Sequence, residues 1–324
     1  MSTFENSKSL LNEIYRTKIL PCETLYGLQH KAVKFSQSQL TSNPMLLLLG
    51  SQGSGKSTFI KNVLAENKIF KGGDSSTTGF SAIVGGSDLG EDRIIPGQTA
   101  VRMNDFPFSS LQSYGSGFLS LFDVLHLAKT KTFLDAITVI DTPPLTNPRH
   151  VLKSAATEWF AQNADMILFF LDPSVDKLDK ELENILKAHG KKARFILNKA
   201  DTLGSQELLS VRGNLIWSLS KVLKEQYPPR LYTLSLRKQK IDAHEGQKMM
   251  LFQEYRDFLE MLGDLPRTAL LDKISIVAKR AESSLIHALL LSHIRKNFIS
   301  SRKAPFTLSQ LFDRVMKKYE IPAD

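Results

Sequence analysis

The sequence has almost no cysteine and no long apolar run. Its 324 residues include one cysteine, Cys22, which excludes an intramolecular disulfide framework or a thiolate metal cluster and suits a reducing compartment. The most apolar runs, residues 45–49 and 166–171, are far shorter than the roughly 18 residues that a membrane span needs. We therefore expect no secretory signal and only peripheral membrane contact, and Ser2 in place of Gly argues against N-myristoylation.

Acidic residues are outnumbered by basic ones. The chain holds 42 Lys and Arg against 33 Asp and Glu, a formal net charge of +9. Such a charge suits an anionic membrane surface or a nucleic acid. Because no recognised RNA- or DNA-binding module accompanies it, we expect no nucleic-acid partner. A composition of 42% hydrophobic and 23% charged residues is typical of a globular protein, and the length favours two domains.

Short apolar runs alternate with longer amphipathic stretches between residues 43 and 245. This pattern is typical of a mostly parallel sheet covered by helices on both faces. We therefore expect an α/β domain over 43–245, with strands at residues 45–49, 80–84, 136–140, 166–171, 194–197 and 230–234.

The two chain ends have a helical pattern. Residues 8–42 carry apolar side chains at helical spacing with a break expected at Pro21, and residues 246–324 predict nearly continuous helix broken at Pro266. Either end alone is too short to build a large core. We expect residues 1–42 and 246–324 to pack together as one all-α domain.

The strongest local signal is the stretch GSQGSGKS at residues 50–57, directly after the first expected strand. It matches the phosphate-binding loop GxxxxGK[ST] of P-loop NTPases. Its glycines let successive backbone N–H groups curl around a phosphate, and the helix that follows points its positive end there. Lys56 is expected to reach the β and γ phosphates, and Ser57 to ligate Mg²⁺. The other expected binding residues of this loop are Gly50, Ser51, Gln52, Gly53, Ser54, Gly55 and Thr58.

Two more sites are expected to complete the Mg²⁺ environment. Asp141 ends the strand expected at 136–140, where an acidic residue can hold the metal. A strand followed by Asp is common, and its place after a P-loop is what favours the metal role. Thr77 and Thr78 lie in a loop rich in Gly, Ser and Thr, where a switch I threonine would close over Mg²⁺ and the γ phosphate.

A base-binding loop is predicted after the strand expected at 194–197. It reads Asn198-Lys199-Ala200-Asp201, the NKxD tetrapeptide of GTPase-type domains. The Asp201 carboxylate suits a guanine edge, the Lys199 stem can lie over a base, and Asn198 can tie this loop to the P-loop. Thr202 follows directly and is included in the predicted nucleotide site.

With these motifs in this order, the chain resembles the EHD family of dynamin-related, membrane-remodelling ATPases. The likeness runs from about residue 10 to the C-terminus, through stretches such as IYRTKILPCETLY, TTGFSAIV, ITVIDTP, ATEWFAQNADMILFFLD and LPRTALLDKI. It implies a dynamin-type G domain flanked by a helical domain built from both chain ends. It also implies a homodimer through the G domain, higher assembly on membranes in vesicle or endosomal trafficking, and slow ATP hydrolysis. The implied location is cytoplasmic, peripherally bound to endosomal or plasma membrane.

The resemblance also implies residue roles. Thr78, with Thr77, takes the switch I role and Asp141 the switch II role, while Gln52 is a candidate for organising the attacking water. Trp217 takes the dimer-face role, with a core aromatic as the alternative. Near residues 294–306, cations interleaved with apolar side chains suit an anionic phospholipid headgroup layer, and a solvated basic helix tip is the alternative. The membrane residues expected there are Arg295, Lys296, Phe298, Arg302 and Lys303.

The sequence also departs from the family pattern. Where the family reads DTPG in switch II, this chain reads DTPP, and Pro144 has no N–H to donate to the γ phosphate. This departure favours binding over hydrolysis and leaves a nucleotide-binding membrane scaffold as an alternative. Asp201 favours guanine on physical grounds and the resemblance favours ATP, so ATP is preferred with GTP left open. The family's C-terminal EH module is not expected, because the sequence given stops at Asp324.

Overall fold

The computed structural model describes residues 2–28, 40–64, 79–87, 91–103, 105–128, 135–144, 151–174, 180–223, 228–237 and 245–300. The chain divides into two compact units. The sheet unit is Ser42–Ala269, and the helical unit combines Met1–Thr41 with Leu270–Asp324. The boundary after the sheet therefore lies at residue 269, later than the predicted 245.

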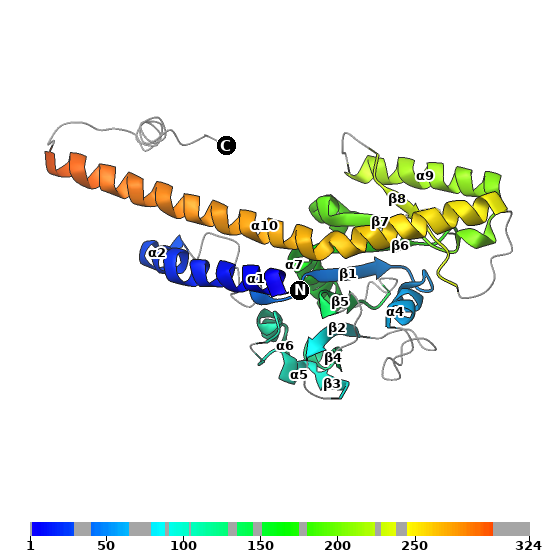
Figure 1. Ribbon diagram of the computed structural model, residues 1–324, viewed down its shortest axis with the longest axis horizontal. Helices are drawn as coiled ribbons and strands as arrows, with labels where there is room; N and C mark the ends of the chain where they lie inside the picture. Colours follow the sequence, from blue (N-terminus) through cyan, green and yellow to red (C-terminus); the bar gives the residue numbers. More distant parts are fainter. Residues whose placement is uncertain are drawn as a thin grey trace. The chain divides into compact units, whose positions relative to one another are not determined.

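The sheet unit is built on one mostly parallel sheet (Figure 1), as predicted. Over the described residues it has eight strands in the order β3-β4-β2-β5-β1-β6-β7-β8. Strands β5, β1, β6, β7 and β8 run parallel to one another, whereas β2 pairs with β5, and β3 with β4, in antiparallel fashion. The strands are β1 (Met45–Gly50), β2 (Phe80–Ser87), β3 (Arg93–Pro96), β4 (Phe122–Ala128), β5 (Thr138–Asp141), β6 (Met166–Leu171), β7 (Ala193–Leu197) and β8 (Leu231–Thr233).

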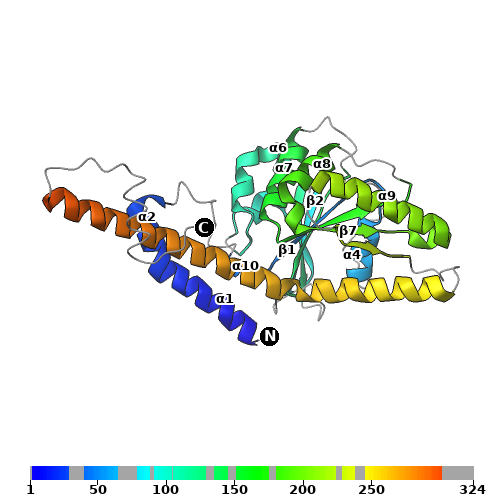
Figure 2. The ribbon, with the colours of Figure 1, turned by 90° about the horizontal axis from the view of Figure 1, so that it is seen from above.

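Helices cover both faces of this sheet because its central strands are apolar on both sides. Every residue of β1 and β6 is buried, and alternate β1 side chains enter two different cores. One core includes α7 (Val151–Asn163), α8 (Lys180–His189) and α9 (Ser205–Leu223). The other includes α4 (Lys56–Leu64) and the first part of α10 (Glu245–Ser300), and Figure 2 shows the two sets on opposite sides of the sheet.

The carboxyl ends of β1, β5, β6, β7 and β8 meet at one edge of the sheet because these strands run parallel. In parallel sheets covered on both faces, ligands bind at this edge. Shorter elements complete the unit: α5 (Gly97–Ala100), α6 (Gly115–Leu119) and the 3-10 turns Ser109–Tyr114, Gly190–Lys192 and Ala200–Thr202.

The helical unit contains the N-terminal helices α1 (Ser2–Ile14) and α2 (Leu20–Tyr26), joined by the π-helical turn Tyr15–Ile19. The predicted break at Pro21 is wrong. Proline lacks an N–H and its ring clashes with a preceding carbonyl, but here it occupies the first turn of α2, where that N–H has no helical partner. The wider π turn comes directly before it, so the chain continues without leaving the helical conformation.

The predicted break at Pro266 is also wrong, because α10 runs through it without interruption. An interior proline costs a helix about 3 kcal/mol. On the N-terminal side, Phe258, Leu262 and Leu265 are buried in the core of the sheet unit. On the C-terminal side, Val277 is buried in the core of the helical unit. Packing on both sides of the proline exceeds the local penalty.

None of the helices in the described part of the chain is both long enough and apolar enough to cross a lipid bilayer.

Candidate nucleotide site

The predicted P-loop lies between the end of β1 and the first residue of α4, at the carboxyl edge of the sheet. Gly50, Gly53 and Gly55 have φ values of 154°, 74° and 106°, which only glycine adopts readily. A Cβ on Gly50 would lie 2.5 Å from the Phe170 carbonyl oxygen, and one on Gly55 would overlap the Asn198 side-chain amide. The loop path therefore requires glycine at positions 50 and 55 for space as well as for backbone conformation.

The remaining loop residues place their side chains differently. Ser54 is buried and its hydroxyl donates to the Ser51 carbonyl over 2.9 Å, which closes the turn. Ser57, the predicted Mg²⁺ ligand, is half-buried at the start of α4, whereas Gln52 and Thr58 are exposed. The Gln52 side chain is thus free of the core and accessible from solvent.

The Lys56 side chain is hydrogen-bonded to the backbone of the P-loop itself. Its Nζ donates to the carbonyl oxygens of Gly50 over 2.7 Å and Ser51 over 3.0 Å. Burial lowers the pKa of Lys56 to about 8, while the negative charge of Asp141 acts in the opposite direction. The cation therefore has neutral carbonyls as hydrogen-bond partners and a single acidic neighbour, an arrangement that favours a polyanionic ligand.

Asp141 ends β5 and is the least compensated charge of the site. The side chain is buried, and no side chain among the described residues donates to either carboxylate oxygen, while hydrogen bonding from the Thr142 amide has only a small lowering effect on the pKa of Asp141. Burial raises the pKa of Asp141 to about 6, against the lowering effect of Lys56. The next residue, Thr142, donates its hydroxyl to the Leu48 carbonyl over 2.7 Å, which fixes the end of β5 against β1. Pro144, half-buried, is the last residue described before the gap at 145–150.

Asn198 joins the base-binding loop to the P-loop, as the sequence predicts. Its Nδ2 donates to the Ser54 carbonyl over 2.9 Å, and its Oδ1 accepts from the Leu236 amide over 3.2 Å. The side chain is buried. One amide group therefore holds three loops in register at the edge of the sheet.

Asp201 and its neighbours provide the polar groups of the predicted base site. Asp201 Oδ1 is buried and has no hydrogen-bond partner among the described residues. Lys199 adopts a left-handed backbone with φ 60°, and the Thr202 hydroxyl donates to its carbonyl over 2.7 Å. Thr202 therefore stabilises the turn through the backbone, and its side chain is exposed.

Two residues at this edge were missed by the sequence reasoning. Ser235 lies in the loop after β8, and its hydroxyl is buried without a hydrogen-bond partner in the part of the chain that the structure describes. A hydrogen bond of 3.1 Å from the Ala200 amide to the Leu234 carbonyl brings its loop against the base-binding loop. Asp172 follows β6 and pairs with Lys199. The usable signal was position, since Asp172 directly follows β6 and Ser235 comes two residues after β8, and both strands end at the carboxyl edge.

Several predicted site residues lie outside the described residues. These are Thr77 and Thr78 of the switch I loop and Arg302 and Lys303 of the predicted membrane tip. Lys296 and Phe298 belong to the backbone of α10, but their side chains are not described. Arg295 is described and exposed.

Trp217 lies on α9 and is 66% exposed, which excludes the alternative of a core aromatic. The Lys221 ammonium lies 5.0 Å from the centre of its ring.

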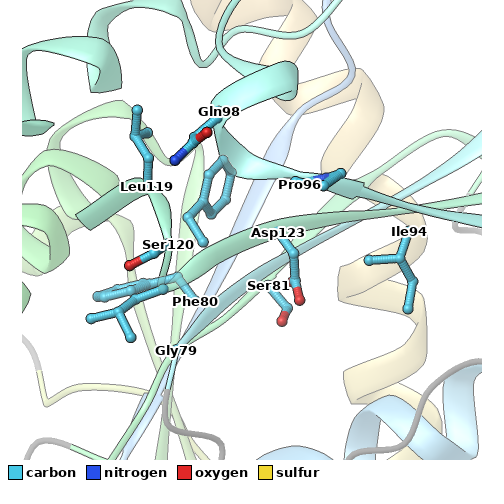
Figure 3. Close-up of a pocket in the computed structure, with 11 residues that line it drawn as sticks. Gly79, Phe80, Ser81, Ile94, Pro96, Gln98, Leu119, Ser120 and Asp123 are labelled. Carbon is cyan, nitrogen blue, oxygen red and sulfur yellow. The ribbon is translucent and has the colours of Figure 1, made fainter. Parts of the chain in front are cut away.

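A hollow of about 600 Å³ lies at the start of β2 and β4 (Figure 3). On its strands β2 and β4, Ser81 pairs in register with Asp123, and Ser81 also pairs with Asp141 of β5. The 11 described residues that line it include no Lys, Arg or His. This hollow therefore lacks the cations that a phosphate requires, and the P-loop is the better phosphate site.

Comparison with known proteins places these motifs in a family. A model described as "50S ribosome-binding GTPase" matches residues 45–199, from the start of β1 into the base-binding loop. EH domain-containing proteins 1 and 2 of Arabidopsis thaliana are 31% and 32% identical, over 96% and 97% of this chain and 60% of each relative. EH domain-containing protein 3 of Rattus norvegicus is 29% identical over 99% of this chain and 63% of that protein.

The chain spans about three fifths of the length of these curated relatives. Among solved structures, a member of an oligomerised bacterial dynamin pair aligns with a TM-score of 0.48 and 14% identity, over 98% of this chain and 63% of that chain. The sequence similarity extends over nearly the whole chain, with a match to a GTPase model at its centre, so this chain resembles the EH domain-containing proteins.

Proposed function

We propose that this chain is a dynamin-like ATPase that binds a nucleoside triphosphate with Mg²⁺, hydrolyses it slowly and assembles on membranes that it remodels. The observation that carries the proposal is the pair of buried charges at the P-loop. Among the described residues, Lys56 donates only to backbone carbonyls, and no side chain donates to the Asp141 carboxylate, on which the Thr142 amide has only a small effect. Buried charges are normally compensated within the fold, so this site is built for a charged ligand.

The residues present fit a magnesium ion. Mg²⁺ prefers oxygen ligands and is usually held by one or two protein groups together with phosphate oxygens and water. The Ser57 hydroxyl at the start of α4 and the unpartnered Asp141 carboxylate are the two groups that would hold it. When bound, the ion supplies charge neutralisation at the phosphates. Lys56 binds and orients the phosphate chain, and exposed Gln52 is the candidate for positioning water.

ATP is the preferred nucleotide, with GTP as the alternative. Resemblance to the EHD ATPases supports ATP, and the acceptor character of Asp201 supports guanine. The buried Ser235 hydroxyl and Asp201 Oδ1 together offer a donor and an acceptor, which match the N1 and N6 groups of adenine or the O6 and N1 groups of guanine. Isothermal titration with ATP and GTP, each with Mg²⁺ and with a chelator, tests the site and the base. Absence of binding by both nucleotides with Mg²⁺ would contradict the proposal.

A nucleotide-dependent scaffold with little hydrolysis is the second candidate, and Pro144 is the observation that favours it. A proline three residues after Asp141 removes an N–H that would otherwise stabilise the transferring phosphoryl group. Single-turnover phosphate release from a stoichiometric complex of protein and [γ-³²P]ATP separates the two candidates. Release at the rate of free nucleotide identifies a scaffold, and faster release identifies an enzyme.

We propose that the exposed face of α9 forms the homodimer contact. Leu209, Gly213 and Trp217 recur every four residues, and Leu209 and Trp217 are 69% and 66% exposed. No atom lies within 4 Å of a Cβ built on Gly213, so the stripe has a shallow centre between two large side chains. Such an anchor aromatic is typical of interface hot spots.

Substitution of Trp217 by Ala should weaken a nucleotide-dependent dimer at least tenfold, measured by sedimentation equilibrium with Mg²⁺ and ATP. The matched control is Phe252→Ala, because Phe252 is an equally exposed aromatic, at 70%, on α10. Equal effects of both substitutions would contradict a specific α9 contact.

The membrane proposal concerns the C-terminal end of α10. Arg295 is exposed there beside Ile294, which is 37% exposed, and a cation near an anionic bilayer contributes on the order of 1 kcal/mol. Co-sedimentation with phosphatidylserine vesicles should weaken about fivefold for Arg295→Glu and remain unchanged for Arg256→Glu, an exposed position in the sheet unit. An endosomal or plasma-membrane site of action follows from the family resemblance and requires localisation in cells.

A further inference from the structure

Asp172 and Lys199 come from neighbouring strands and meet at the carboxyl edge of the sheet. Strands β6 and β7 are parallel, and Leu171 pairs in register with Leu197, so the residues that follow each strand emerge side by side. The Lys199 ammonium donates to Asp172 Oδ2 over 2.5 Å. The two side chains are 29% and 13% exposed, respectively, which makes this a partly buried ion pair.

Asp172 is itself fixed by the loop that follows it. Its other oxygen, Oδ1, accepts from the Ser174 amide over 3.0 Å and from the Ser174 hydroxyl over 2.7 Å. Burial acts to raise the pKa of Asp172, but the hydrogen bonds from Lys199 and Ser174 hold it below its usual range. The carboxylate is therefore ionised at neutral pH and has a defined orientation.

Lys199 is held at its backbone as well as at its ammonium. Its left-handed backbone is the one positive φ among the described non-glycine residues. Its carbonyl accepts from the Thr202 amide over 3.1 Å and from the Thr202 hydroxyl over 2.7 Å. Because both ends are held, the four-carbon stem between them has little freedom.

The Lys199 stem lies in the predicted base site. Asn198 on one side is bonded to the P-loop, and Asp201 on the other carries an unpartnered buried oxygen. An ammonium already paired with Asp172 is not the group that reads a base. The methylene stem is then the apolar surface that Lys199 offers to a base, since long basic side chains cover flat apolar groups with their stems.

We propose that Asp172 is a positioning residue for nucleotide-base binding, which anchors the Lys199 ammonium so that the Lys199 stem forms one wall of the base site. Asp172 acts through Lys199 and does not touch the nucleotide. This inference rests on the proposed nucleotide-binding function. It gives the loop after β6 a role in base recognition, in addition to the loop after β7.

The test compares a ligand with a base and a ligand without one. Full-length wild type and Asp172→Asn are titrated calorimetrically with Mg·ATP, Mg·GTP and Mg·tripolyphosphate, and the melting temperature of each free protein is recorded. Asp172→Asn should weaken the preferred nucleotide about tenfold and leave tripolyphosphate affinity within twofold. The control Glu183→Gln, which removes the surface pair of Glu183 with Lys187 on α8, should change neither.

A second variant distinguishes positioning from a direct role. Lys199→Met keeps an unbranched stem and removes the ammonium, so Asp172→Asn should have no further effect on ATP affinity in a Lys199→Met background. Full additivity of the two substitutions would overturn the inference. Equal loss of ATP and tripolyphosphate by Asp172→Asn, or loss of neither, would overturn it as well. If wild type binds none of the three ligands, the proposed function itself fails, and the inference fails with it.

Discussion

Two buried charged sites in this molecule are built in opposite ways. In the helical unit, Arg280 donates to both oxygens of Glu23, over 2.6 Å from Nε and 2.8 Å from Nη2. Tyr15 donates its hydroxyl to the same carboxylate over 3.0 Å, and the Arg280 guanidinium lies 5.4 Å from the centre of the Tyr15 ring. In this network each strong donor has a strong acceptor.

The P-loop site of the sheet unit is left open instead. Over the residues that the structure describes, Lys56 donates only to backbone carbonyls, and the Asp141 carboxylate has no side-chain donor. Buried polar groups that are left unsatisfied cost free energy, and in native proteins they mark places with a task beyond stability. The closed network therefore holds a fold together, and the open one is prepared for a ligand.

Removing one member of the closed network should have the largest effect on stability. Glu23→Gln leaves the buried Arg280 guanidinium without its counter-charge, and breaking a buried pair in this way costs about 3–5 kcal/mol. Urea unfolding measures the loss, and hydrogen exchange over residues 8–28 assigns it to the helical unit. Nucleotide affinity should not change. The control Glu13→Gln, an exposed position on α1, should be neutral, and a loss below about 1 kcal/mol for Glu23→Gln would contradict this role.

The open site should give an unusual dependence of stability on pH. The pKa of Asp141 is about 6 in the folded protein against 3.8 normally. Between these values the folded state keeps a proton that the unfolded chain has released, so the free energy of unfolding falls as pH rises, by about 3 kcal/mol. The pKa of Lys56 is about 8 against 10.5 normally. Between those values the folded state has lost a proton that the unfolded chain retains, so stability rises with pH by about 3 kcal/mol.

These two effects together predict that Asp141 and Lys56 lower the free energy of unfolding of the ligand-free protein most between about pH 6 and 8. Urea unfolding of the wild type and of each variant at pH 4 to 10 measures this contribution as the difference in unfolding free energy. Asp141→Asn should flatten the acid slope and Lys56→Met the basic one. A wild-type curve parallel to that of both variants would show that these charges are already compensated in the fold.

Local sequence patterns predicted much of the fold but failed where tertiary packing determines the secondary structure. All six predicted strands exist, since continuous apolar runs mark central strands. Strands β3 and β4 were missed. In β4 the apolar run is interrupted by Asp123 and His126, one on each face of the strand, and β3 has four residues ending in proline. The break expected at Pro266 was wrong because burial on both sides of that proline is a property of the tertiary structure, and the break expected at Pro21 was wrong because this proline lies in the first turn of α2, after a π-helical turn.

The site residues also divide into those that local sequence patterns predicted and those that they did not. Residues of the P-loop, Asp141 and Asn198 could be predicted because each is local to one strand and the loop after it. Asp172 and Ser235 carry no pattern of their own. Their importance depends on strand order, since β6 and β8 flank β7 in the sheet. A rule applied to one segment marks each residue as following a strand, but which loops meet at the edge depends on the strand order.

The next prediction concerns Asn198, which links the P-loop to the loop after β8. Asn198 is the amide that bonds Ser54 of the P-loop and Leu236 after β8. Asn198→Ala leaves both backbone groups unpaired in a buried place, which should cost about 2 kcal/mol. The same change should weaken Mg·ATP binding about tenfold, measured by calorimetry. Asn198→Asp keeps the acceptor for Leu236 and loses the donor to Ser54, so it separates the two contacts. Unchanged ATP affinity in both variants would contradict a structural link to phosphate binding.

The smallest expected effect is on the rate of hydrolysis. It tests whether the backbone N–H that Pro144 lacks limits that rate. Pro144 follows Asp141 by three residues and has no N–H. Pro144→Ala and Pro144→Gly both restore that donor, whereas only Gly adds backbone freedom. If the missing donor limits hydrolysis, both variants should release phosphate about tenfold faster than wild type in single turnovers, a change of about 1.4 kcal/mol in activation free energy. A gain by Gly alone would assign the slow step to backbone rigidity, and no gain by either would place the limit elsewhere than at Pro144.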